Sequence, residues 1–249
     1  MKRYLLVTII ILLFNYLYAQ KFELSVQAYS GLFHYSGNGA VSTSTFIQSS
    51  SPGHDYTNNP YGNKNAFSYG AGLQVQHVAK SGFVIGLGGQ YEILRSKVII
   101  NGYYPDIVYP FYNIATPLPY RVNGNSFLQD QDIDLNPYIG YRVKFNTISI
   151  DILPGFDVGF NLSSYDKGKA TSVNPPSNQP PETYQTNFKR PDAPTDIRLR
   201  LGLAANYKRV SVTASYAHGL TNYDKNMTGG NYDVRSELIR FGMAYKLSN

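Results

Sequence analysis

Beyond its first twenty residues the chain contains eight stretches in which apolar and polar residues alternate. A period of two is that of a β-strand with one face toward an apolar medium and the other toward a polar one. The sixth stretch, for example, contains Arg198-Leu199-Arg200-Leu201. The predicted strands cover residues 22–33, 67–78, 83–94, 133–145, 148–161, 197–207, 210–220 and 237–247.

The connections between these strands alternate strictly between short and long. Tight turns at 79–82, 145–147 and 208–209 join the strands in pairs. The long loops cover about 34–66, 96–132, 162–194 and 221–234. Because successive strands run in opposite directions, all long loops lie at one end. This pattern predicts an all-β fold, an eight-stranded antiparallel up-and-down transmembrane β-barrel with long extracellular loops and short periplasmic turns, typical of small bacterial outer-membrane proteins.

Alternation alone leaves open which face lies inside, because a secreted lipocalin-like carrier would turn the apolar face inward. The composition of the polar face favours the opposite arrangement, with the polar side chains inside, since this face carries charges of both signs among small residues. An eight-stranded lumen is just wide enough for side chains to fill it, and buried charges there must be paired. Turning Arg198 or Arg200 toward lipid would cost roughly 2–4 kcal/mol each. The predicted lumen charge network is Glu23, Glu92, Asp134, Arg142, Lys144, Asp151, Asp157, Arg198, Arg200, Arg240 and Lys246.

The start of the chain has the features of an export signal. Lys2 and Arg3 precede an apolar run from Leu5 to Phe14, which is too short to cross a bilayer as a helix. Leu17-Tyr18-Ala19 is suited to cleavage. We therefore expect a signal peptide at 1–19 and a barrel domain at 20–249.

Composition narrows the function classes further. The chain has no cysteine, which excludes disulfides and thiol chemistry. Its formal charge of +6 falls to +4 when the two leader cations are removed, and the remainder is dispersed. We therefore expect no nucleic-acid partner and no cofactor.

The leader ending in Tyr18-Ala19-Gln20, the eight strands and the final Ile239-Arg240-Phe241-Gly242-Met243-Ala244-Tyr245-Lys246-Leu247 carry a family resemblance. Together they resemble the outer-membrane β-barrel family that includes PorT-like and OmpX-like proteins. The resemblance covers the whole mature chain and rests on its pattern of strands. It implies a barrel in the outer membrane, within a family whose members differ in role and in part serve secretion or adhesion.

The loops hold the candidate binding surface. Tyrosines among small polar residues make adaptable contact surfaces, although loops of this kind also serve simply to shield the barrel mouth. Val98-Ile99-Ile100 is predicted to extend the third strand above the membrane, and the proline pairs at 175–176 and 180–181 to be extended. Expected partners are outer-membrane lipid along the wall and extracellular or envelope proteins at the loops.

Two patterns suggest chemistry. His34-Tyr35-Ser36 has the spacing of a histidine and a serine in a lipid-modifying barrel enzyme, but no acid lies nearby in sequence. His77 and His218 lie on apolar faces near strand ends, as interfacial anchors do. We expect no catalytic residues.

The second pattern is the run from Asp130 to Asn136, whose alternating oxygens match the start of a calcium-binding loop. The glycine and glutamate that such a loop needs at its sixth and twelfth positions are replaced by Leu135 and Tyr141. In a strand this spacing places all four polar side chains on one face, where we expect them to descend toward Arg142 and Lys144 and form ion pairs rather than bind metal.

The sequence thus favours a non-enzymatic outer-membrane barrel with a side-chain-filled lumen and surface loops used for binding or envelope structure. The alternatives are a secreted lipocalin-like carrier of a hydrophobic ligand and a lipid A-modifying barrel enzyme. A passive pore is disfavoured, because the bulky charged lumen leaves no channel.

Overall fold

The computed structural model describes residues 22–49, 55–105, 120–173, 180–191, 193–224 and 232–247. The predicted signal peptide, residues 1–19, lies outside this part of the chain. Within it, no helix is long and apolar enough to cross a membrane.

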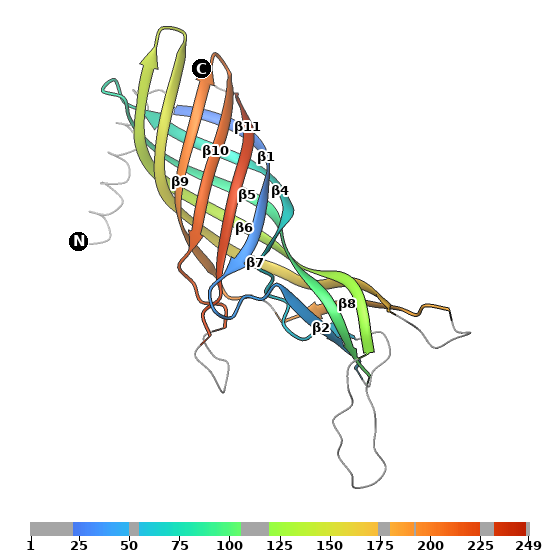
Figure 1. Cartoon of the computed structure of the whole chain (residues 1–249). Helices are drawn as coiled ribbons and strands as arrows, with labels where there is room; N and C mark the ends of the chain where they lie inside the picture. Colours follow the sequence, from blue (N-terminus) through green and yellow to red (C-terminus); the bar gives the residue numbers. More distant parts are fainter. Residues whose placement is uncertain are drawn as a thin grey trace, which may run out of the picture.

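Eight strands form a closed ring (Figure 1). They are β1 (Phe22–Ser36), β4 (Lys64–Val78), β5 (Phe83–Tyr104), β6 (Tyr120–Phe145), β7 (Ile148–Ser172), β9 (Asp196–Tyr207), β10 (Val210–Gly219) and β11 (Arg235–Lys246). Each ring strand pairs antiparallel with the ring strand before it in the chain, and β1 pairs with β11 to close the ring. The predicted eight-stranded up-and-down barrel is confirmed. Within the ring, the strands begin and end close to the predicted residues.

The three tight turns lie at one end of the barrel. In two of them a residue other than glycine adopts the left-handed region, Asn146 at φ 44° and Lys208 at φ 53°. Two-residue hairpin turns need this conformation because it matches the twist of the strands that they join. The third turn uses Gly82 at φ 93°.

The barrel wall turns its apolar face outward. On β9, Leu201 is 53% exposed whereas Arg198 is fully buried. The same contrast holds around the ring, where the outward positions form an apolar belt that includes Leu73, Ile85, Leu87, Tyr91, Ile133, Ile139, Ile152, Phe160, Leu199, Ile239, Phe241 and Met243. The lipocalin-like alternative is therefore wrong, because it requires the opposite facing.

Three ring strands continue far beyond the barrel. β5, β6 and β7 have 22, 26 and 25 residues, about twice the length that crosses a bilayer. They are joined there by β2 (Thr43–Ile47), β3 (Tyr56–Thr57) and β8 (Thr183–Arg190). These extensions, together with β2, β3 and β8, form a projection at the long-loop end, at the lower right of Figure 1.

The projection corrects the assignment of 34–66, 96–132 and 162–194 to loops alone. The extension of the third predicted strand through Val98-Ile99-Ile100 is borne out, since β5 continues to Tyr104. The rest was missed because the neighbouring polar residues resemble loop sequence, while the strands are stabilised by pairing with one another. β2 runs parallel to β5, β3 pairs with β2, and β8 pairs with β7.

The projection has an apolar core of its own, made of Phe46, Val98, Ile100, Tyr103, Val122 and Ala170. The rings of Tyr103 and Tyr184 stack over it with centroids 3.9 Å apart. The edge strands β3 and β8 meet through the rings of Tyr56 and Phe188, 5.7 Å apart, and through a hydrogen bond from the Thr186 hydroxyl to the carbonyl of Asp55. The projection is thus a rolled sheet rather than a set of separate loops.

Candidate functional site

The half of the lumen nearer the long-loop end contains a layer of five charged side chains from five strands. Arg240 donates to Glu92 at 2.7 Å and to Asp157 at 2.6 Å. Arg198 lies 3.3 Å from Asp134 and 3.4 Å from Glu92. All five are buried. Because an isolated buried charge is very unfavourable, the layer is stable only while each member keeps its partners.

The acidic run on β6 contributes Asp134 to this layer. Asp130, Asp132, Asp134 and Asn136 are all buried on one face, as the spacing predicts. Their arginine partners differ from those expected: Asp134 contacts Arg198 and Arg240 in place of Arg142 and Lys144. The reason is the tilt of barrel strands, which brings residues from distant strands to the same height.

Four further residues contact the layer. Arg198 also contacts Asp196 at 2.5 Å and Asp132 at 3.7 Å. Asp157 accepts from Asn136 at 2.8 Å and lies 3.1 Å from Arg200.

A second charged cluster lies nearer the short-turn end. Arg142 donates to Asp151 at 2.7 Å and to Glu23 at 3.1 Å, and Lys246 also contacts Glu23. The predicted network therefore divides into two clusters. Lys144 belongs to neither, because it is exposed and has no ion-pair partner within the described ranges.

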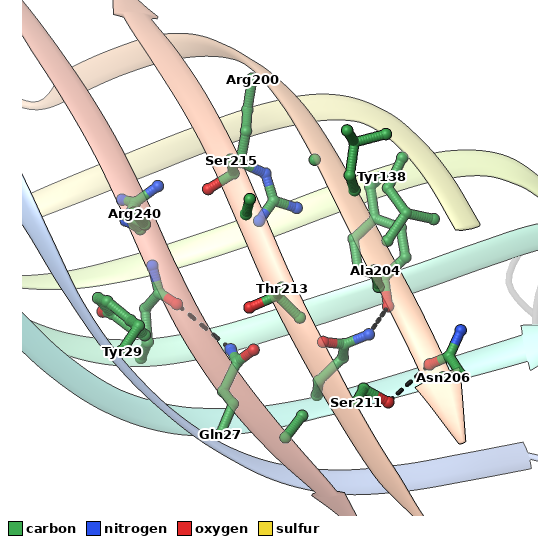
Figure 2. Close-up of a pocket in the computed structure, with 17 residues that line it drawn as sticks. Gln27, Tyr29, Tyr138, Arg200, Ala204, Asn206, Ser211, Thr213, Ser215 and Arg240 are labelled. Atoms are coloured by element: carbon green, nitrogen blue, oxygen red, sulfur yellow. Dashed lines mark hydrogen bonds between the residues drawn. The ribbon is translucent and has the colours of Figure 1, made fainter. Parts of the chain in front are cut away.

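A small cavity lies beside the first cluster and is lined in part by Arg200 and Arg240 (Figure 2). Gln27 donates to Gln90 at 3.3 Å on one side and Ser211 to Asn206 at 2.6 Å on the other. Its volume is about 60 Å³. A water molecule needs roughly 10–15 Å³ by this measure, so the cavity has room for a few waters. It is far smaller than the roughly 300–1,000 Å³ of a small-molecule site.

An apolar cluster closes the lumen toward the projection. It comprises Phe33, Tyr35, Leu94, Leu128, Ala217, Val234 and Leu238. The Tyr35 ring makes edge contacts with Tyr61 and Tyr223 from the long loops, both with centroids 5.1 Å away. Burial, with Asp224 nearby, raises the pKa of Tyr61 to about 12.

Four polar side chains gather on the outer wall near the long-loop rim. Glu237 accepts from the Tyr216 hydroxyl at 2.5 Å and lies 3.1 Å from the Ser36 hydroxyl and 2.6 Å from His218 Nδ1. Sequence reasoning found Ser36 but missed Glu237, 201 residues away. The signal available in the sequence was the carboxylate of Glu237 on the outward face of the last predicted strand.

Two other histidines lie among the described residues. His34 stands directly opposite Glu237 on β1, and His77 contacts the Phe22 ring at 5.5 Å near the short-turn end. Among the residues with described positions, no group of three or more histidine, aspartate or glutamate side chains is arranged to hold a metal ion.

The chain matches no protein-family model and no curated protein. Among solved structures it is similar to Ail, the attachment invasion locus protein of Yersinia pestis, in complex with the heparin analogue sucrose octasulfate. The identity is 14%, the match covers 91% of this chain and 99% of that chain, and the TM-score is 0.39. Neisserial surface protein A is 9% identical, with 90% and 97% covered and a TM-score of 0.35. Scores this low leave the barrel assignment to the strand pairing itself.

Proposed function

We propose that this chain is an integral outer-membrane β-barrel that neither conducts nor catalyses, and whose projection binds an extracellular or envelope partner. One observation carries the proposal: the lumen is filled by ion pairs and capped by aromatic rings, while three strands continue into a projection with its own core. The apolar belt suits contact with lipid chains. A cleaved leader at residues 1–19 and kinship with PorT-like or OmpX-like barrels belong to the same proposal.

The geometry at the rim favours a non-enzymatic role. A serine nucleophile needs a base within hydrogen-bond reach, most often a histidine. Ser36 contacts the Glu237 carboxylate and, at 3.4 Å, the carbonyl of Arg235, and among the described residues no hydrogen bond joins it to a histidine. The Glu237 carboxylate already accepts from the Tyr216 hydroxyl and lies beside His218, so its contacts are those of a hydrogen-bonded rim cluster.

Planar-bilayer recording of the purified protein tests the closed lumen. We expect no discrete conductance steps, and a band that migrates faster unboiled than boiled on a denaturing gel. Regular conductance steps would contradict the closed lumen. A soluble protein without the heat-shifted band would contradict the membrane assignment.

A shortened variant tests the role of the projection. Residues 98–126 would be replaced by a two-residue turn joining Lys97 to Phe127, which stand opposite each other on β5 and β6. We expect the full chain to cross-link to envelope or extracellular partners on intact cells, and the shortened chain to lose these products while keeping the heat-shifted band. Unchanged cross-links would contradict partner binding by the projection.

A further inference from the structure

The outer wall changes character where the strands leave the apolar belt. One row near the end of the belt on β5, β6 and β7 is Tyr91, Ile133 and Phe160, three residues that are paired side by side, and the exposed Leu162 follows it on β7. Farther toward the long-loop end, the outward positions of β5, β7 and β8 carry cations. These outer-wall cations are Arg95, Lys97, Lys167, Lys169 and Lys189.

The strand register places the outer-wall cations close together. Lys97 stands opposite Phe127, which stands opposite Lys167, so the two lysines are two strands apart, or about 10 Å. In the neighbouring row nearer the short-turn end, Arg95 and Lys189 are separated by two intervening strands. Lys169 lies in the next row farther from the short-turn end. Five cations therefore share one patch of four adjacent strands.

These cations have no carboxylate partner within the described parts of the chain, whereas Arg142, Arg198, Arg200 and Arg240 in the lumen are all ion-paired. Arg95 donates to Gln129 at 3.2 Å and lies 5.7 Å from the centre of the Tyr69 ring. The outward positions between the cations are polar and uncharged, apart from Phe127, Ile99 and Tyr165. They include Asn123, Asn125, Gln129, Thr171, Gln185 and Asn187.

The position of the outer-wall cations relative to the apolar belt indicates the class of ligand that they bind. Arg95 lies four residues past Tyr91, which is about 13 Å along the strand and less in height, because barrel strands tilt. In a barrel embedded to the top of its apolar belt, Arg95 and Lys189 stand at the level of the lipid headgroups, and Lys97, Lys167 and Lys169 stand farther out. Lysine and arginine there attract phosphate, and neighbouring amides can hydrogen-bond sugar hydroxyls.

We propose that the outer-wall cations bind the phosphate groups of an anionic glycolipid of the outer leaflet. The inference rests on the membrane insertion proposed above. A lipid is favoured over a soluble polyanion because the cations continue the same outward face that carries the apolar belt, so one glycolipid molecule can contact the belt with its chains and the cations with its headgroup.

The test uses the mature protein in detergent micelles, titrated calorimetrically with bisphosphorylated lipid A, dephosphorylated lipid A and a sulfated polysaccharide. The variant Lys97→Gln/Lys167→Gln/Lys189→Gln removes three outer-wall cations. The matched control Lys80→Gln/Lys144→Gln/Arg209→Gln removes three exposed cations at the short-turn end. The charge-preserving variant Lys97→Arg/Lys167→Arg/Lys189→Arg checks that the patch tolerates substitution.

We expect bisphosphorylated lipid A to bind in a salt-sensitive way, and the outer-wall variant to bind it about tenfold to a hundredfold more weakly, as loss of several headgroup-level cations predicts. The control and the arginine variant should bind like the natural chain, and dephosphorylated lipid A should bind weakly to all. Equal binding by the outer-wall variant, equal binding of dephosphorylated lipid, or binding of the sulfated polysaccharide alone would overturn the proposal. Failure of the protein to give a heat-shifted band would instead overturn the membrane assignment.

Discussion

In β5, β6 and β7, the barrel half and the projection half turn opposite classes of residue inward. In the barrel, β5 buries Glu92 and exposes Tyr91. In the projection, the same strand buries Ile100 and turns Lys97 outward. The period of two residues continues throughout. What changes is which residue class occupies each face, and the proposed media explain the change: lipid around the barrel and water around the projection.

The two halves also differ in how their cores stabilise the fold. The lumen depends on ion pairs, in which attraction is largely offset by the cost of removing charges from water. The core of the projection depends on apolar burial, which favours folding directly. We therefore expect truncation of a single charged partner to damage the barrel more than loss of a methyl group damages the projection.

The largest effect is expected from Arg240→Leu. The substitution leaves Glu92, Asp157 and Asp134 with fewer cationic partners in a buried layer. Breaking such a network by removing one partner costs about 3–5 kcal/mol. Urea unfolding in lipid vesicles measures the loss, with the exposed Lys144→Leu as control, and a difference below about 1 kcal/mol would contradict the role of the layer.

A smaller loss is expected when charge is placed on the outer wall. Leu201→Lys puts an ammonium group at mid-height of β9, where lipid contact makes it cost about 2–4 kcal/mol. Leu220→Lys near the rim should cost about 0–1 kcal/mol. Equal costs at the two depths, measured in the same vesicle assay, would show that the belt does not face a bilayer.

The projection should respond locally to Ile100→Val. The deleted methylene lies in its apolar core, so we expect a loss of about 0.5–1.5 kcal/mol. Rates of proteolysis within the projection should rise while the heat-shifted barrel band stays unchanged. Ile99→Val, the same substitution on the outward face of β5, is the matched control, and an equal rise there would refute the separate core.

The smallest effect concerns alkaline pH. Burial, with Asp55 nearby, raises the pKa of Tyr103 to about 12, against about 10 for a free phenol. The folded projection therefore disfavours the phenolate: its stability contribution is complete below pH 10 and is lost as the pH rises toward 12. The tyrosinate absorbance difference between the natural chain and Tyr103→Phe should titrate near 12, whereas a midpoint near 10 would contradict the burial.

The sequence predicted the parts of the molecule that local periodicity determines. Each ring strand was found, and Arg198 and Arg240 were placed on the inward face. The partners of these arginines were not predictable, since they depend on the shear of the closed barrel. The contact between Ser36 and Glu237 was missed for a related reason, because it forms only where the first and last strands close the ring.

The projection escaped prediction for a different reason. Its strands are held by pairing with segments far away in the chain, such as β2 with β5, and their polar outward residues resemble those of loops. Only the short apolar run at 98–100 showed a local signal.

The parallel pairing of β2 with β5 has a consequence for the order of assembly. β2 precedes β4 in the chain but can pair with its partner only after β4 and β5 have formed. β3 can contact β8 only after β7 has formed. Both contacts join residues that are closer in the chain than those of the ring closure, in which β1 pairs with β11, so loop closure does not delay them beyond the ring. A pulse-labelled chain should therefore acquire protease resistance of the projection no later than its heat-shifted band.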